Sequence, residues 1–275
     1  MNSLVKLVLL AGASLGLCSA ALAGPRVASL NLCADQYILA LAEPEQILSL
    51  SPDAHDRVLS HAAIKARNFP ITNGSAEAIA AYGPDIVFAN PYGRDGTKSL
   101  LQGLGITVIE LEVAQDFEAI KRQTRIVAQA LEQSARGEAL ITDMERRLTS
   151  THQDGPRPVA VNLQRRGFIA GAGTLVDAAM TAAGFDNLAR KISGDAVRQV
   201  SLEELLIHKP DFIVLNQTLT RAEDWGTILL EHPALTSLYP PAKRLMLESH
   251  YTVCGGPAFP DAVDRLRSQF NARRN

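Results

Sequence analysis

Short hydrophobic runs alternate with helical patterns along the chain. Continuous apolar stretches predict strands near residues 26–30, 46–50, 86–88, 107–111, 158–163 and 212–214. Apolar residues at helical spacing follow the first strand of each half, near 35–41 and 175–183. Because strands that alternate with helices are typical of parallel sheets, the pattern predicts an α/β protein with two lobes.

An internal repeat with a constant offset of 126 residues supports two similar lobes. Residues 75–90 read SAEAIAAYGPDIVFAN, and residues 201–216 read SLEELLIHKPDFIVLN. Each serine is a predicted helix N-cap, and each glutamate lies in the first turn, where the helix dipole favours an acid. Each proline ends the helix before an apolar strand. Asn90 and Asn216 then fall at strand carboxyl ends, where open α/β sheets bind ligands.

A long helical stretch lies between the two repeats. Its apolar residues recur at helical spacing, at Phe117, Ile120, Val127 and Leu131 and again at Leu140, Ile141, Met144 and Leu148. Ser134 is the predicted cap of the second part, and the sequence DGPRP stops the helix. We therefore predict a first lobe at 24–133, a connecting helix at 134–153 and a second lobe at 154–275. The helical part, which ends at about Ser150, would span about 25 Å.

The first 23 residues have the pattern of an export signal. Lys6 supplies the positive charge, and the apolar run that follows is too short to span a bilayer. The tripeptide ALA at 21–23 predicts cleavage after Ala23 and hence a periplasmic location. The alternative is a membrane anchor or a lipoprotein with lipid on Cys18, but a lipoprotein site requires a small residue before the cysteine, and Leu17 is large.

The charge balance argues against nucleic-acid binding, and the cysteine content bears on whether a disulfide forms. Lys and Arg number 27 against 29 Asp and Glu, and aromatic residues make up 5%, so no nucleic-acid surface is expected. Cleavage after Ala23 would leave two cysteines, Cys33 and Cys254. In an oxidising compartment two such thiols commonly pair, so we expect a disulfide; the alternative is two unrelated buried thiols.

Three sequence blocks together resemble one family. They are RVASLNLCADQ at 26–36, the two repeats, and GAGTLVDAAMTAAGFDNLA at 171–189. In this order they resemble the class III periplasmic substrate-binding proteins of ABC importers, which carry ferric siderophores, haem and cobalamin. The resemblance implies two Rossmann-like lobes joined by a single long α-helix, a ligand cleft between the lobes, and small lobe motions. We expect a monomer.

The resemblance also implies a membrane partner. Family members present one surface glutamate on each lobe to an arginine pocket of the ABC permease, and the matching residues here are Glu77 and Glu203. The alternative is that both are ordinary acids of a first helical turn. Two docking points at a fixed separation would orient the protein on the permease.

Loops after strand carboxyl ends supply the candidate ligand-binding residues. They are Asn31, Asp53, Tyr92, Arg94, Arg165, Arg166, Phe168, Trp225, His250 and Tyr251. Arginine forks match the oxygens of an anionic ferric siderophore or similar metal chelate, which is the expected cargo. Cobalamin and haem are the alternatives; for haem, His250 or Tyr251 would ligate the iron. The protein itself is expected to hold no cofactor beyond the Fe³⁺ or cobalt that the cargo carries.

An enzyme is the main alternative class. The only G-x-S-x-G sequence lies within the export signal, so residues 24–275 hold no nucleophile elbow of the hydrolase type. Gly171 and Gly173 lack the third glycine of a dinucleotide fingerprint. No histidine or cysteine pair has the spacing of a metal site. We therefore expect no catalytic activity and no metal site formed by the protein alone.

Overall fold

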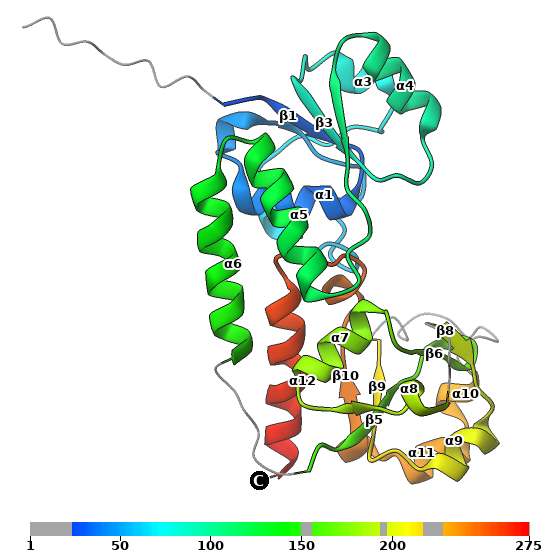
Figure 1. The fold of residues 1–275 in the computed structure, drawn as a ribbon. Coiled ribbons are helices and arrows are strands. Elements are labelled where there is room, and N and C mark those ends of the chain that lie inside the picture. Colours follow the sequence, from blue (N-terminus) through cyan, green and yellow to red (C-terminus); the bar gives the residue numbers. More distant parts are fainter. Residues whose placement is uncertain (1–23, 150–155, 193–196, 217–227, 275) are drawn as a thin grey trace, which may run out of the picture.

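The computed structural model describes residues 24–149, 156–192, 197–216 and 228–274. Two lobes are each built on a four-stranded parallel sheet (Figure 1). The first sheet has the order β2-β1-β3-β4, with β1 (Val27–Ser29), β2 (Ile47–Ser49), β3 (Ile86–Ala89) and β4 (Thr107–Glu110). The second has the order β10-β9-β5-β7, with β5 (Val159–Asn162), β7 (Asp186–Asn187), β9 (Phe212–Leu215) and β10 (Arg244–Met246). The predicted two-lobed α/β architecture is confirmed.

Helices cover both faces of the first sheet. They are α1 (Leu32–Leu41), α2 (Ala63–Ala66), α3 (Ala76–Ala80) and α4 (Asp95–Gly103). Helix α1 begins three residues before the predicted start because Asn31 Oδ1 accepts hydrogen bonds from the amides of Cys33 and Ala34. Buried residues of α1 pack on one face of the sheet, and Ile79 and Leu101 pack on the other. Both faces of the sheet are therefore part of the core.

The second lobe repeats this arrangement with additional elements. Its helices are α7 (Leu175–Ala182), α8 (Ala189–Ile192), α9 (Leu202–His208), α10 (Ile228–Glu231), α11 (Pro233–Leu238) and α12 (Phe259–Arg274). The strands β6 (Phe168–Ala170) and β8 (Val197–Gln199) form a short antiparallel pair, and this pairing was not predicted. The pair forms a separate two-stranded sheet, which follows β5 along the chain.

The repeat occupies equivalent places in the two lobes. Ser75 Oγ accepts from the amide of Ala78, and Ser201 Oγ accepts from that of Glu204, each at 3.2 Å. The strands that follow, β3 and β9, each pair in parallel with the first strand of their lobe. The predicted caps and the buried strands are therefore confirmed.

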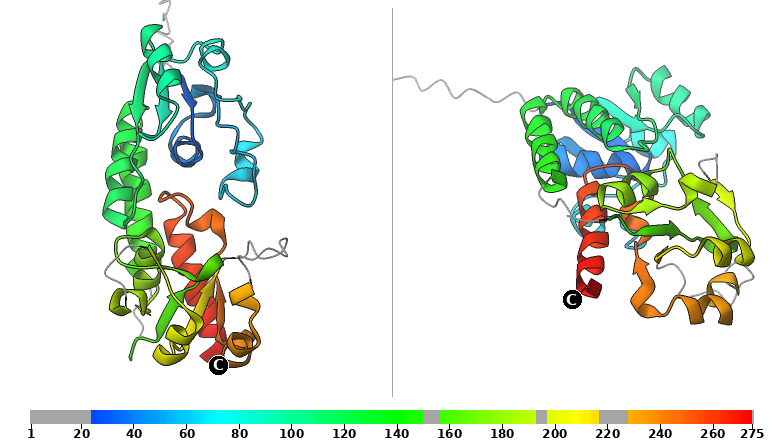
Figure 2. Two further views of the ribbon diagram at one scale, coloured as in Figure 1. Left: turned by 90° about the vertical axis from the view of Figure 1, so that its right-hand side faces the viewer. Right: turned by 60° about the horizontal axis from the view of Figure 1, so that its bottom comes forward.

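The predicted connecting helix is present, and a second helix antiparallel to it also packs in both cores. Helix α6 (Ser134–Thr149) is the predicted connecting helix. Helix α5 (Phe117–Ala130) begins in the core of the second lobe, through Ile120, and ends in that of the first, through Val127 and Leu131. Figure 2 shows the two helices side by side along the first lobe, with their ends reaching the second. We call this pair the α5–α6 brace.

No helix in the described parts of the chain is long and apolar enough to cross a membrane.

Candidate ligand-binding site

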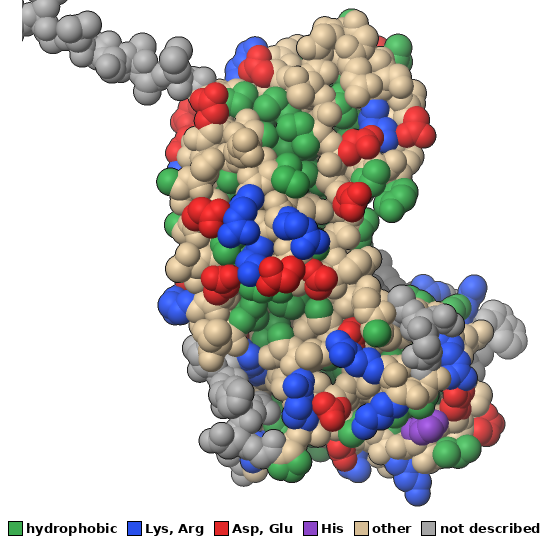
Figure 3. Space-filling view, in the orientation of Figure 1, with side chains coloured by type: hydrophobic (Ala, Val, Ile, Leu, Met, Phe, Trp, Pro, Cys, Tyr) green, Lys and Arg blue, Asp and Glu red, His purple; other side chains and the backbone are tan. Residues whose placement is uncertain are grey.

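The carboxyl ends of the second-lobe strands point toward the first lobe (Figure 1). The surface is indented between the lobes on the side away from α6 (Figure 3). In an open α/β fold a ligand site is expected in the loops that follow the carboxyl ends of the parallel strands. The predicted site residues can be placed relative to this edge.

Arginines of the second lobe lie directly after β5. The turn Arg165–Gly167 follows Gln164, and the side chains of Arg165 and Arg166 are both exposed. Arg166 has a left-handed backbone, with a φ of 58°, and its carbonyl accepts a hydrogen bond of 2.7 Å from Gln199 Nε2. Phe168 begins β6 and is partly exposed. This segment therefore presents two cationic groups and an aromatic ring on the rim of the second lobe.

An amide network supports this rim from below. Asn162 Nδ2 donates to Asn216 Oδ1 at 3.3 Å, and Gln164 Nε2 donates to Asn162 Oδ1 at 2.9 Å. Asn216, the last residue of the second repeat, thus joins the ends of two neighbouring strands. This network fixes the start of the arginine turn.

Two cationic side chains that follow β3 form contacts within the first lobe. Arg94 Nη1 donates to the carbonyl oxygen of Gly74 at 2.8 Å. Lys98 is almost fully buried, and its ammonium group pairs with Glu110 at 2.6 Å and with Asp95 at 2.9 Å. The hydrogen bond to Glu110 is the main reason that the pKa of Lys98 is raised. Tyr92 is 71% exposed in the intervening loop. Arg94 and Tyr92 thus remain exposed at this edge of the first lobe, whereas Lys98 is held inside it.

A buried carboxyl group lies beneath the first-lobe edge. Asp35 is fully buried, and its carboxylate accepts from Ser51 Oγ at 2.5 Å and from the Ser51 amide at 3.1 Å. Burial raises the pKa of Asp35 to about 6, against the lowering effect of these hydrogen bonds. Asp53 is exposed nearby, and Asn31 uses its side-chain oxygen to cap α1. Sequence reasoning did not identify Asp35, because nothing local signals its burial.

Aromatic rings from both lobes meet at the lobe boundary. The ring centroids of His250 and Tyr251 lie 4.2 Å apart, and His61 of the first lobe lies 5.8 Å from His250 and 5.3 Å from Tyr251. His61 Nε2 also lies 3.3 Å from Asp261 Oδ2 of the second lobe. Burial, followed by the nearby His61, lowers the pKa of His250. The candidates His250 and Tyr251 therefore lie at the boundary between the lobes. His61, which was not among the predicted residues, contacts both of them.

Cys33 and Cys254 form a disulfide with their Cα atoms 5.1 Å apart. The predicted pairing is confirmed in the structure. It joins the N-terminus of α1 in the first lobe to the loop 249–257 of the second.

The glutamates of the repeat are exposed in the first turn of α3 and of α9. Hydrogen bonds from the Glu203 backbone and from Ser201 lower the pKa of Glu203, which therefore stays ionised. Trp225 and the signal segment 1–23 lie outside the described residues.

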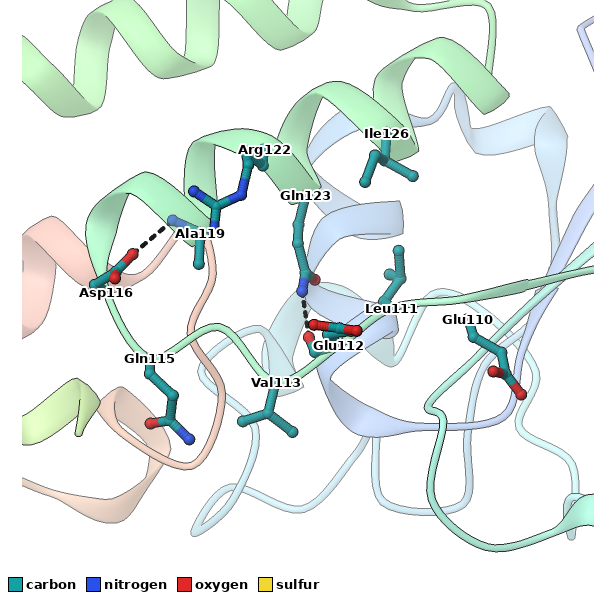
Figure 4. A pocket seen from close by; sticks show the side chains of 10 residues that line it. All are labelled: Glu110, Leu111, Glu112, Val113, Gln115, Asp116, Ala119, Arg122, Gln123 and Ile126. Carbon is teal, nitrogen blue, oxygen red and sulfur yellow. Dashed lines mark hydrogen bonds between the residues drawn. The ribbon is translucent and has the colours of Figure 1, made fainter. Parts of the chain in front are cut away.

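A separate pocket of about 480 Å³ lies between α5 and the segment that follows β4 (Figure 4). Asp116 caps α5 through the amide of Ala119 at 2.7 Å, and Gln123 Nε2 donates to the carbonyl of Glu112. Val113 and Ile126 are half exposed at the pocket. Two of its polar side chains thus stabilise the chain itself, and the pocket lies beside the brace.

Comparisons with known proteins identify the family. The model of the family described as periplasmic binding protein matches residues 27–238. The chain belongs to this family. Family members bind small molecules and work with ABC permeases, so the protein is a substrate-binding transport protein of periplasmic type.

Individual relatives have different named cargoes. A cobalamin-binding protein from Halobacterium salinarum is 22% identical over 90% of this chain and 69% of the relative. The haem-binding RhuT from Roseiflexus sp. RS-1 has a TM-score of 0.71 and 23% identity over 92% of this chain and all of that one. The haem-binding HutB of Vibrio cholerae has a TM-score of 0.73 and 19% identity over 89% of this chain and 98% of that one. At these identities the solved structures show the fold.

Proposed function

We propose that the protein is exported, captures an anionic ferric siderophore or similar metal chelate between its lobes, and delivers it to an ABC permease. The observation that carries the choice of cargo is the pair Arg165 and Arg166, exposed on the turn that directly follows β5. Guanidinium groups bind carboxylate, catecholate and hydroxamate oxygens through charge-assisted hydrogen bonds. Phe168 beside them supplies an apolar wall.

Cobalamin is the second candidate. Arg94, the third candidate arginine, already donates one hydrogen bond to the carbonyl oxygen of Gly74, so fewer of its N–H groups are available to an anionic cargo. The Halobacterium salinarum relative named for cobalamin binding aligns with 90% of this chain. A neutral corrinoid needs hydrogen bonds and flat apolar walls more than cationic groups.

A thermal-shift screen tests capture. The mature protein is heated with ferric hydroxamate, catecholate and carboxylate siderophores, with haemin and with cyanocobalamin. A ligand that binds the folded state alone raises the melting temperature, so at least one ferric siderophore should do so. A shift with cyanocobalamin alone would support the second candidate, and a shift with haemin alone would replace both. If no compound shifts the transition, capture of a metal chelate is wrong.

Substitution of Arg165 and Arg166 distinguishes the ferric chelate from cobalamin as the cargo. Replacing Arg165→Gln and Arg166→Gln should raise the Kd for an anionic ferric chelate by about tenfold or more, because each charge-assisted hydrogen bond contributes about 1.5–3 kcal/mol. The same change should leave the Kd for cyanocobalamin nearly unchanged. Isothermal titration calorimetry measures both. Arg57→Gln, an exposed arginine elsewhere in the first lobe, controls for loss of charge.

We propose that docking to the permease uses Glu77 and Glu203. Their equivalent positions in the two repeats, on exposed first turns of helices, support this role. Exposed ion pairs are individually weak, so the two contacts would act together.

A further inference from the structure

The second lobe inserts a loop into the first beside the brace. In the loop 249–257, Cys254 is bonded to Cys33, and Gly255 accepts a hydrogen bond of 2.9 Å from the hydroxyl of the buried Tyr37. Both Cys33 and Tyr37 belong to α1. We call the disulfide, the Tyr37 hydrogen bond and this loop the clasp.

The fit of this loop is close. A Cβ atom added at Gly255 would clash with the backbone carbonyl of Ala114, in the segment that leads to α5. Gly256 lies against the ring of Tyr37, where an added Cβ would be 3.7 Å from the nearest ring carbon. The loop is therefore held between α1 on one side and the segment that leads to α5 on the other, and Gly255 has no room for a side chain.

The clasp lies between the brace and the indentation of the surface. In Figures 1 and 2 the loop before α12 lies beneath α1, on the side of α5 that faces away from α6. A brace alone would allow the lobes to rotate about the α5–α6 axis, as a hinge does. A second attachment, displaced from that axis toward the cleft, opposes this rotation.

We propose that the clasp fixes the width of the cleft covalently and is a redox-sensitive control of lobe motion. While the disulfide is intact, the two lobes move as one body and His250 and Tyr251 stay against His61. A dithiol reductant of the exported compartment would donate two electrons and two protons to the S–S bond. Two cysteine thiols would form, the dithiol would become a cyclic disulfide, and the lobes would rotate about the brace.

The partly exposed position of Cys33 allows such exchange, whereas Cys254 is buried. The folded lobes do not depend on this bond for their cores, because each sheet is covered on both faces by its own helices. Reduction should therefore change lobe motion and leave the fold intact.

Distance measurement between the lobes tests the clasp without any ligand. Nitroxide labels on p-acetylphenylalanine replace Tyr82 in the first lobe and Ile207 in the second, both exposed. Double electron–electron resonance on the oxidised protein should give one narrow distance distribution. Reduction with a phosphine, or the double change Cys33→Ser with Cys254→Ser, should give a broader distribution that extends to longer distances.

Two controls make every outcome decisive. Tyr37→Phe removes the hydrogen bond and keeps the disulfide, so its distribution should stay narrow. Circular dichroism at the same temperature reports whether the reduced protein is folded. An unchanged distribution after reduction would overturn the proposal, and so would unfolding, because the bond would then be required for the fold. The result does not depend on the cargo, so the proposed function can fail separately.

Discussion

At the residue scale, contacts of charged side chains within a lobe decide which charged groups can bind a ligand in the cleft. The sequence placed Arg94 after a strand, but it could not show that Arg94 donates to the carbonyl of Gly74. Nor could it show that Lys98 is buried between Asp95 and Glu110. Such pairings depend on contacts between segments, which no local pattern encodes. The caps at Ser75 and Ser201 were predictable because a cap depends on the next three residues alone.

Asp35 yields a pH prediction at this scale. Its pKa in the folded state is about 6, above the usual 3.8, so protonation favours folding. The contribution is complete below about pH 4 and is lost as the pH rises through 6. At pH 7, Asp35→Asn should raise the free energy of unfolding by up to about 3 kcal/mol, with the difference vanishing near pH 4.

Urea unfolding between pH 4 and pH 7.5 measures this difference. Asp53→Asn, an exposed acid on the same edge, is the matched control and should follow the wild type more closely. If Asp35→Asn left the pH dependence unchanged, the buried carboxyl would not be the titrating group.

At the scale of elements, strands and helices followed from the hydrophobic pattern, and packing between helices did not. The spacing of Phe117, Ile120, Val127 and Leu131 predicted a helix, but its role in both cores appears only in three dimensions. The short pair β6 and β8 was missed because two- or three-residue strands carry little pattern.

Gly137 of α6 tests this packing. By helix propensity alone, Gly137→Ala should stabilise the protein by up to about 1 kcal/mol. In the structure an added Cβ would lie only 2.5 Å from Ala128 Cβ of α5, so the helices would have to separate. We therefore expect the free energy of unfolding to fall by about 1–3 kcal/mol.

Gly96→Ala is the control, since Gly96 lies in α4 and an added Cβ there meets nothing within 4 Å. It should leave the free energy of unfolding unchanged or raise it slightly. A stabilising Gly137→Ala, measured by urea denaturation, would show that the two helices of the brace are not closely packed.

At the scale of the molecule, the internal repeat and the family resemblance predicted two lobes and a connecting helix. They did not give the second spanning helix, the inserted loop or the contact of His61 with Tyr251. The brace and the clasp connect the two lobes at different positions. We therefore predict that the width of the cleft changes little.

Docking is also a property of the whole molecule. Glu77→Ala combined with Glu203→Ala should abolish uptake of the bound chelate in cells and leave its Kd unchanged, because both acids lie on exposed helix turns. Each single change should reduce uptake less than the pair does. Glu45→Ala, an exposed glutamate outside the repeats, is the control. Loss of affinity in the double variant would mean that these glutamates contribute to the ligand site.

Capture of a metal-bearing cargo between the lobes can be tested by anomalous X-ray diffraction from crystals of the mature protein with the chelate that binds it. We predict one iron or cobalt peak in the space between the two sheets, with Arg165 or Arg166 in contact with the chelate. A peak on an outer surface, or in the pocket beside α5, would contradict the account.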